Sequence, residues 1–162
     1  MNKKNRLTVG LGAVAMALLL SACAAKPPED VSIKGTVEAV DSINPDGMGR
    51  PSPLLIKVFQ LNAIDKFEAA DYFALSDSAE ATLGADLLGV ESIRLAPGDR
   101  KPYEGEFDPQ TRFIGVIAGF RNIHQAKWRA VVEMPEKSML KLGKRGAVHI
   151  KADSLAISVS VE

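Results

Sequence analysis

The segment 50–61 (RPSPLLIKVFQL) constrains the fold most strongly, because it is the most apolar run after the N-terminal region. Pro51 and Pro53 disfavour helix at the residues before them, and the β-branched Ile56 and Val58 favour a strand. The density of apolar side chains between 54 and 61 predicts a strand buried on both faces. A turn of buried helix is the alternative that this pattern leaves open.

Several other segments show the period of two that is typical of half-buried strands. Residues 31–40 place Val31, Ile33, Val37 and Ala39 on one face and polar side chains on the other. Further strands are expected at 92–96, 100–107, 113–120, 127–133 and in the C-terminal segment. Roughly seven or eight short strands separated by turns predict a mainly β fold, a two-sheet antiparallel sandwich.

The C-terminal segment changes its apolar parity at Asp153-Ser154. Val148, Ile150 and Ala152 are apolar at even positions, whereas the apolar residues from Leu155 to Val161 stand at odd positions. Because a shift of one residue exchanges the two faces of a strand, a bulge or a tight turn must lie at Asp153-Ser154.

A helical insertion is expected between the second and third strands. Ile64, Phe67 and Phe73 recur near helical spacing in FEAADYFAL, and Asn62 or Asp65 is available as a cap. TLGADLLG predicts a second helical turn that ends at Gly89. The aromatic residues Phe67, Tyr72 and Phe73 are interpreted as core side chains.

Length and composition indicate one globular domain. The chain has 162 residues, of which 46% are hydrophobic and 25% are charged. Three of its 20 basic residues lie in the first 22, which leaves 17 basic against 20 acidic residues after them. Nucleic-acid binding needs a basic face, so a mildly acidic surface argues against it.

The N-terminus has the pattern of a secretion signal. Lys3, Lys4 and Arg6 precede an apolar stretch, 7–20, that is too short to span a bilayer. Residues 20–23 (LSAC) resemble the bacterial lipobox, which implies a signal peptide of residues 1–22 and lipid transfer to Cys23, the only cysteine. An ordinary A-x-A cleavage site around Cys23 is the alternative, and it would give an unlipidated protein that starts at Ala25.

Residues 23–30 form the expected lipidated tether, and 31–162 the folded domain. Pro27 and Pro28 stiffen the tether, whose last seven residues reach roughly 25 Å when extended. One acyl chain holds a protein marginally, whereas a multiply acylated Cys23 anchors it stably. Ala24 stands where lipoproteins retained in the inner membrane commonly have aspartate, so the sorting pattern implies the outer membrane, facing the periplasm.

The loop 41–49 (DSINPDGMG) is rich in turn formers. Asp41, Asn44 and Asp46 invite a calcium-loop interpretation, but their spacing misses the EF-hand pattern, and a solvated loop is preferred. The loop also lacks the motifs that cradle phosphate. Met48 is either an exposed contact side chain or one that folds back on the domain.

No pattern typical of an enzyme, a metal site or a cofactor site stands out. His124 and His149 are the only histidines and lie far apart in the sequence, so a zinc site is not expected. Glu104, Glu106 and Asp108 are interpreted as a solvated edge rather than a catalytic carboxylate pair.

Five sequence blocks together resemble the TssJ (SciN/VasD) family of type VI secretion lipoproteins. They are the lipobox, RPSPLLIKVFQL, FEAADYFAL, LGADLLG followed by LAPG, and FIGVIAGFRNIHQAKWR. The blocks follow the family order and cover most of residues 23–133, whereas the C-terminal strands match in pattern alone.

The resemblance implies a transthyretin-like sandwich that is anchored by acylated Cys23 in the outer membrane and does no catalysis. It implies binding to the periplasmic domain of TssM, and through TssM an indirect link to TssL. In the family the contact is the loop between the first two strands, here 41–50. The predicted contact residues are Asn44, Pro45, Asp46, Gly47, Met48, Gly49 and Arg50.

Two other functions stay open at this point. A periplasmic lipoprotein that binds a small molecule or a glycan would show an apolar pocket with a few convergent polar groups. A transthyretin-like hydrolase would need histidines and basic residues gathered in one groove, which two separated histidines make unfavourable.

Overall fold

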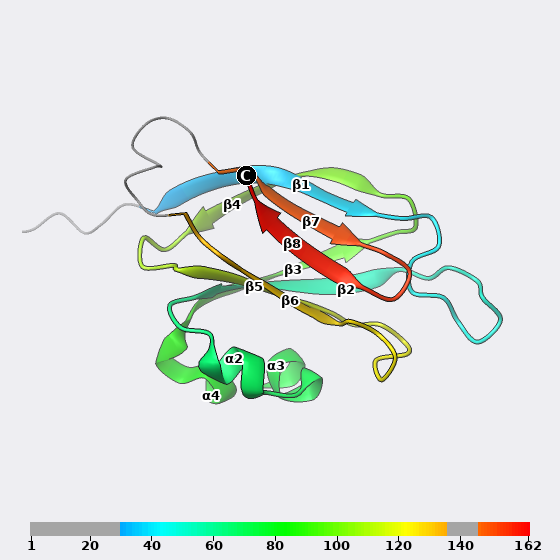
Figure 1. Cartoon of the computed structure of the whole chain (residues 1–162), viewed down its shortest axis with the longest axis horizontal. Helices are drawn as coiled ribbons and strands as arrows, with labels where there is room; N and C mark the ends of the chain where they lie inside the picture. Colours follow the sequence, from blue (N-terminus) through cyan, green and yellow to red (C-terminus); the bar gives the residue numbers. More distant parts are fainter. Residues whose placement is uncertain (1–29, 136–145) are drawn as a thin grey trace, which may run out of the picture.

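The computed structural model describes residues 30–135 and 146–162, which form two four-stranded sheets packed face to face (Figure 1). Sheet A has the strand order β4-β1-β7-β8, and sheet B has the order β3-β2-β5-β6. The strands are β1 (Val31–Ala39), β2 (Leu54–Leu61), β3 (Leu87–Leu95), β4 (Arg100–Phe107), β5 (Phe113–Ala118), β6 (Arg129–Glu133), β7 (Val148–Ala152) and β8 (Ile157–Val161). The prediction of a two-sheet, mainly β sandwich is confirmed.

One strand pair departs from the antiparallel expectation. The chain leaves sheet B after β6 and enters sheet A as β7, which runs parallel to β1 from the pair Gly35 and Val148 to the pair Ala39 and Ala152. All the other pairs between these strands are antiparallel. Parallel neighbours need a long crossover connection, which here runs through sheet B. The apolar alternation within one strand does not show which distant strand it will pair with.

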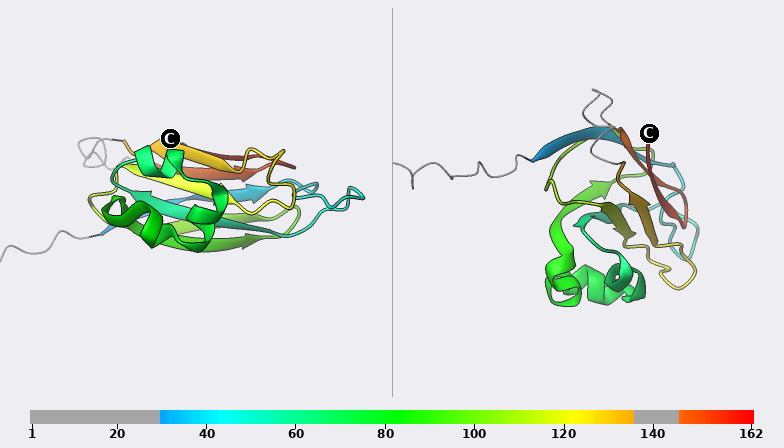
Figure 2. Two further views of the ribbon diagram at one scale, coloured as in Figure 1. Left: turned by 90° about the horizontal axis from the view of Figure 1, so that it is seen from below. Right: turned by 60° about the vertical axis from the view of Figure 1, so that its left-hand side comes forward.

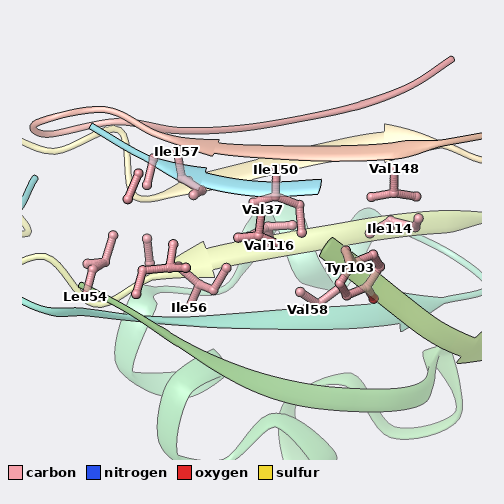
Figure 3. Close-up of a cluster of buried hydrophobic side chains, with 14 of the residues drawn as sticks. Val37, Leu54, Ile56, Val58, Tyr103, Ile114, Val116, Val148, Ile150 and Ile157 are labelled. Carbon is pink, nitrogen blue, oxygen red and sulfur yellow. The ribbon is translucent and has the colours of Figure 1, made fainter. Parts of the chain in front are cut away.

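The core lies between the two sheets, where alternate side chains of both interdigitate. Figure 3 shows Val37 and Ile150 of sheet A facing Ile56 and Val116 of sheet B. All four are at most 1% exposed. Burying an aliphatic side chain of this size contributes about 1.5–3 kcal/mol, so this layer is the main source of the stability of the sandwich.

The central strand β2 is buried on both faces over its second half. Leu54, Ile56 and Val58 point into the inter-sheet core, whereas Phe59 and Leu61 join a second cluster under the helices. Leu55, on the helix-facing side but near the start of the strand, remains 42% exposed. The helices thus cover the outer face of β2 at its end and leave its beginning open.

The helical insertion is confirmed, but its internal boundaries differ from the prediction. It contains α2 (Asp65–Ala69), α3 (Tyr72–Asp77), α4 (Ala79–Leu83) and a 3₁₀ turn, η1 (Gly84–Asp86). They lie against the outer face of sheet B (Figures 1 and 2).

The single helix expected over FEAADYFAL is broken at Ala70, whose backbone is extended. Asp71 accepts a hydrogen bond from the Ala74 amide and so starts a new helix, while neither Asn62 nor Asp65 acts as the predicted cap. A short acidic side chain competes in this way for backbone amides and favours helix starts over helix interiors.

Two further expectations for this region were wrong. Residues 87–89 belong to β3 instead of a helical turn, since Leu87 pairs with Leu61 and Gly89 with Gln60 of β2. Phe73 is 62% exposed on α3 and is not a core side chain, although Phe67 is fully buried. Pairing with a neighbouring strand outweighs a weak local helical preference.

The parity change at Asp153-Ser154 comes from a tight turn between β7 and β8. The Asp153 amide donates to the Ala156 carbonyl at 2.8 Å, and the two strands then pair antiparallel from Ala152 and Ile157 onward. No helix in residues 30–135 and 146–162 is long and apolar enough to cross a membrane.

Gly115 of β5 provides a test of how tightly the helices pack on sheet B. A β-carbon at this position would lie 2.6 Å from Cζ of Phe67, whose ring is fully buried next to Phe59. We expect Gly115→Ala to lower the free energy of unfolding by about 1–3 kcal/mol, because neither ring can move without displacing the other. Gly47→Ala is the control, since nothing lies within 4 Å of the added carbon. Urea denaturation measures both, and equal stability of the two variants would contradict this packing.

Candidate functional site: the loop between β1 and β2

The predicted contact loop leaves the end of the sandwich that is opposite to the start of β1. β1 runs along the sheet from Val31 to Ala39, and the connection to β2 then extends past the strand ends (Figures 1 and 2). The beginning of the folded domain and the tip of this loop therefore lie at opposite ends of the long axis.

The root of the loop is part of the folded core. Ile43 is 0% and Asn44 is 3% exposed. The Asn44 side chain donates to the Pro53 carbonyl at 2.8 Å and accepts from the Arg121 amide at 2.8 Å. Its own amide donates to the Ser154 carbonyl at 2.9 Å. One residue thus ties the loop to the start of β2, to the β5–β6 connection and to the β7–β8 turn.

This arrangement distinguishes Asn44 from the other predicted contact residues, which are not buried. The Asn44 side chain is buried and fully engaged, so it positions the loop and is not available to a partner. The candidate contact segment narrows to 45–50.

Asp46 closes the tip of the loop into a compact unit. One carboxylate oxygen, Oδ1, accepts from the amides of Met48 at 2.9 Å and Arg50 at 3.0 Å. The other, Oδ2, accepts from Nε of Arg50 at 2.8 Å and forms an ion pair with Nη2 of the same side chain, also at 2.8 Å. The backbone amide of Arg50 and then its guanidinium hold the pKa of Asp46 below its ordinary value. The Asp46 and Gly49 amides complete the turn by bonding to the Arg50 and Asp46 carbonyls.

The closed tip displays Met48 to solvent. Its side chain is 81% exposed, which decides between the two alternatives for this residue in favour of the exposed one. Because the backbone on both sides of Met48 is hydrogen-bonded, little conformational entropy remains to be lost when a partner binds. An ordered loop with one large apolar side chain at its tip suits protein recognition.

A second loop lies beside the tip. Pro45, Asp46 and Gly47 form one wall of a cleft of about 280 Å³, and Arg121 and Asn122 of the β5–β6 connection form the other. Sequence reasoning did not single out Arg121, because 77 positions separate it from Asn44. Arg121 and Asn44 do not form a recognisable sequence motif together.

The other sequence candidates lie elsewhere. His149 Nδ1 is 2.9 Å from the Thr36 hydroxyl on the outer face of sheet A, and Glu104 forms an exposed ion pair with Lys34 at 3.0 Å. Across the described ranges, 30–135 and 146–162, no three His, Cys, Asp or Glu side chains gather as a metal site would require. Cys23, the signal segment 1–22 and the tether up to residue 29 lie outside the described residues.

Asn44 has a left-handed backbone, with φ of 47°, a conformation that asparagine and glycine adopt more easily than alanine. We expect Asn44→Ala to destabilise the domain by about 2–4 kcal/mol, because it strains the backbone and removes two part-buried hydrogen bonds, to the Pro53 carbonyl and from the Arg121 amide. Asn44→Gly removes the same hydrogen bonds but does not strain the backbone. It should therefore lower the free energy of unfolding by about 1 kcal/mol less than Asn44→Ala does. Urea denaturation separates the two contributions, and a wild-type midpoint for Asn44→Ala would refute the role of this residue.

Comparison with known proteins identifies relatives of this chain. Residues 31–160 match the family model described as type VI secretion lipoprotein, VasD, EvfM, TssJ, VC_A0113. No curated protein matches the chain.

Solved structures agree with the family match. The T6SS lipoprotein TssJ1 from Pseudomonas aeruginosa has 30% identity and a TM-score of 0.74, over 83% of this chain and 98% of that one. Serratia marcescens Lip, a membrane bound component of the type VI secretion system, has 27% identity and a TM-score of 0.72, over 82% and 98%. A chain from a structure described as a type VI membrane complex has 23% identity and a TM-score of 0.66, over 81% and 97%, and shows the fold alone.

These findings confirm the resemblance drawn from the five sequence blocks. The family model spans nearly the whole folded domain, and the strand arrangement agrees with that of TssJ1. The chain therefore belongs to the type VI secretion lipoprotein family that includes TssJ and VasD.

Proposed function

We propose that this chain is a structural lipoprotein of the type VI secretion trans-envelope complex that anchors the complex to the outer membrane. In this proposal residues 45–50 bind the periplasmic domain of TssM, and TssL is linked indirectly through TssM. The observation that carries the proposal is the ordered loop tip with its exposed Met48. Membership of the family supports it.

The proposed anchor lies at the other end of the domain. Residues 1–22 are the signal peptide, acylated Cys23 begins the tether 23–30, and the folded domain comprises 31–162. Since β1 begins at the end opposite to the loop, a lipid attached ahead of Val31 leaves the loop facing away from the membrane. The lipid and the partner then occupy the two ends of the long axis.

A single strand connects these two ends. β1 starts directly after the tether and finishes directly before the loop, and it pairs with β4 on one side and with β7 on the other. A pull between the lipid and the partner therefore runs along the covalent backbone of β1, and the two sheets need not separate. This load path suits a protein whose role is mechanical.

Replacement of the proposed lipid acceptor tests the anchor. We expect Cys23→Ser to lose the acyl groups and to move the protein from the membrane fraction to the soluble periplasmic fraction. Ala24→Asp is the companion variant, and the sorting pattern predicts that it stays lipidated but is retained in the inner membrane. Mass spectrometry of the N-terminal peptide and membrane fractionation measure both. A Cys23→Ser protein that remains in the outer membrane would refute the anchor.

Replacement of Met48 tests the contact. We expect Met48→Asp to weaken binding to the purified TssM periplasmic domain about 30-fold or more, since a central apolar contact contributes about 2 kcal/mol or more. Phe73→Asp is the matched control, because Phe73 is also a large exposed apolar residue but lies on α3. Calorimetry with the full chain in detergent gives both dissociation constants.

Other outcomes of this experiment point to other sites or functions. If Met48→Asp still binds TssM and Phe73→Asp does not, the contact lies on the helical insertion around α3 and not on the loop. No binding by the folded wild-type chain would refute the TssM partnership and return attention to a small-molecule or glycan ligand.

A further inference from the structure

Arg121 lies beside the loop tip and is held there by the fold. It follows Phe120, which is 4% exposed, and its amide donates to the buried Asn44 side chain at 2.8 Å. The backbone of Arg121 is therefore fixed relative to Pro45, Asp46 and Gly47, with which it lines the cleft. The side chain itself is exposed.

The guanidinium of Arg121 has no anionic partner in the parts of the chain that the structure describes. Asp46 lines the same cleft, but its carboxylate already accepts three hydrogen bonds from Met48 and Arg50 and forms an ion pair with the Arg50 guanidinium. Arg121 is close enough for its charge to contribute to the lowered pKa of Asp46, yet the two form no ion pair. The cleft is thus lined by the Arg121 side chain and by one carboxylate, Asp46, which is already paired with Arg50.

Other exposed arginines of the domain lie in different settings. Arg100 is paired with Glu38 at 2.9 Å, and Arg112 stacks over the ring of Phe113. Arg94 lies on β3, an edge strand of sheet B, and has no ion pair among the described residues. Arg94 therefore matches Arg121 in charge and exposure but not in position.

We infer that Arg121 forms the second half of the partner-binding surface and receives a carboxylate from the partner. This inference rests on the proposed function. The planar guanidinium fork matches the two oxygens of an Asp or Glu side chain, and such pairs fix geometry as well as adding attraction. The partner surface would thus present an acidic residue next to an apolar depression that accepts Met48.

Charge reversal at Arg121 tests the inference against the purified TssM periplasmic domain. We expect Arg121→Glu in the full chain to weaken binding about tenfold or more, because it places two like charges together. Arg121→Gln should weaken binding less and should make it less sensitive to salt between about 50 and 300 mM NaCl. Arg94→Glu is the control and should bind as the wild type does. Among the described residues Arg121 is tied to the fold through its backbone amide, which the substitutions keep, so thermal stability should not change.

The outcomes distinguish a failure of the Arg121 contact from a failure of the proposed TssM binding. If Met48→Asp loses binding while Arg121→Glu binds like the wild type, the carboxylate contact is overturned and the TssM partnership stands. If Arg121→Glu proves unstable, Arg121→Gln decides, and an unchanged salt dependence overturns the inference. If the wild-type chain does not bind, both proposals fail together.

Discussion

The structure depends on the burial of β2 between sheet A on one side and the helical insertion on the other. Ile56 and Val58 contribute to the inter-sheet core, and Phe59 and Leu61 contribute to the cluster under the helices. The helices contain at most six residues each and would not be stable alone, so their packing on sheet B is what holds them. Arg129 reinforces this packing by donating to the carbonyls of Phe67 and Ala70 at the end of α2.

Because β2 is held so firmly, the segment that leads into it is held as well. The Pro53 carbonyl, directly before β2, accepts from the Asn44 side chain, while β1 fixes the other end of the connection. The loop is therefore attached at both ends to central strands of the two sheets. A binding element built in this way keeps its shape under load and loses little entropy on association.

Neighbouring residues of the loop differ in whether they serve the fold or face solvent. Ile43 and Asn44 serve the fold, Asp46 and the Arg50 head group close the turn, and Met48 faces outward. The turn between β5 and β6 adds Arg121, whose amide serves the fold and whose side chain is left for other contacts. The proposed contact residues thus come from two distant segments that the buried Asn44 side chain holds together.

Much of the fold could be predicted from the sequence. Alternation in 31–40 and the apolar run 54–61 determined two central strands, and the change of parity at Asp153-Ser154 located a break between the last two. The sequence blocks also identified the family and the loop. Each strand, the break between the last two strands and each sequence block can be recognised from the residues of a single short segment.

The remaining features depended on contacts between distant segments. Local helix propensity could not reveal that Leu87 pairs with Leu61, that β7 runs parallel to β1, or that Asp71 starts a second helix within FEAADYFAL. Nor could it reveal that Asn44 is buried while Met48 is exposed, since both stand in one polar loop. The sequence by itself determined the strands, the family and the loop that carries the candidate site. Only the tertiary structure decided which side chains of that loop are buried and which face solvent, because burial is set by neighbours such as Pro53, Arg121 and Ser154 that lie outside the tip.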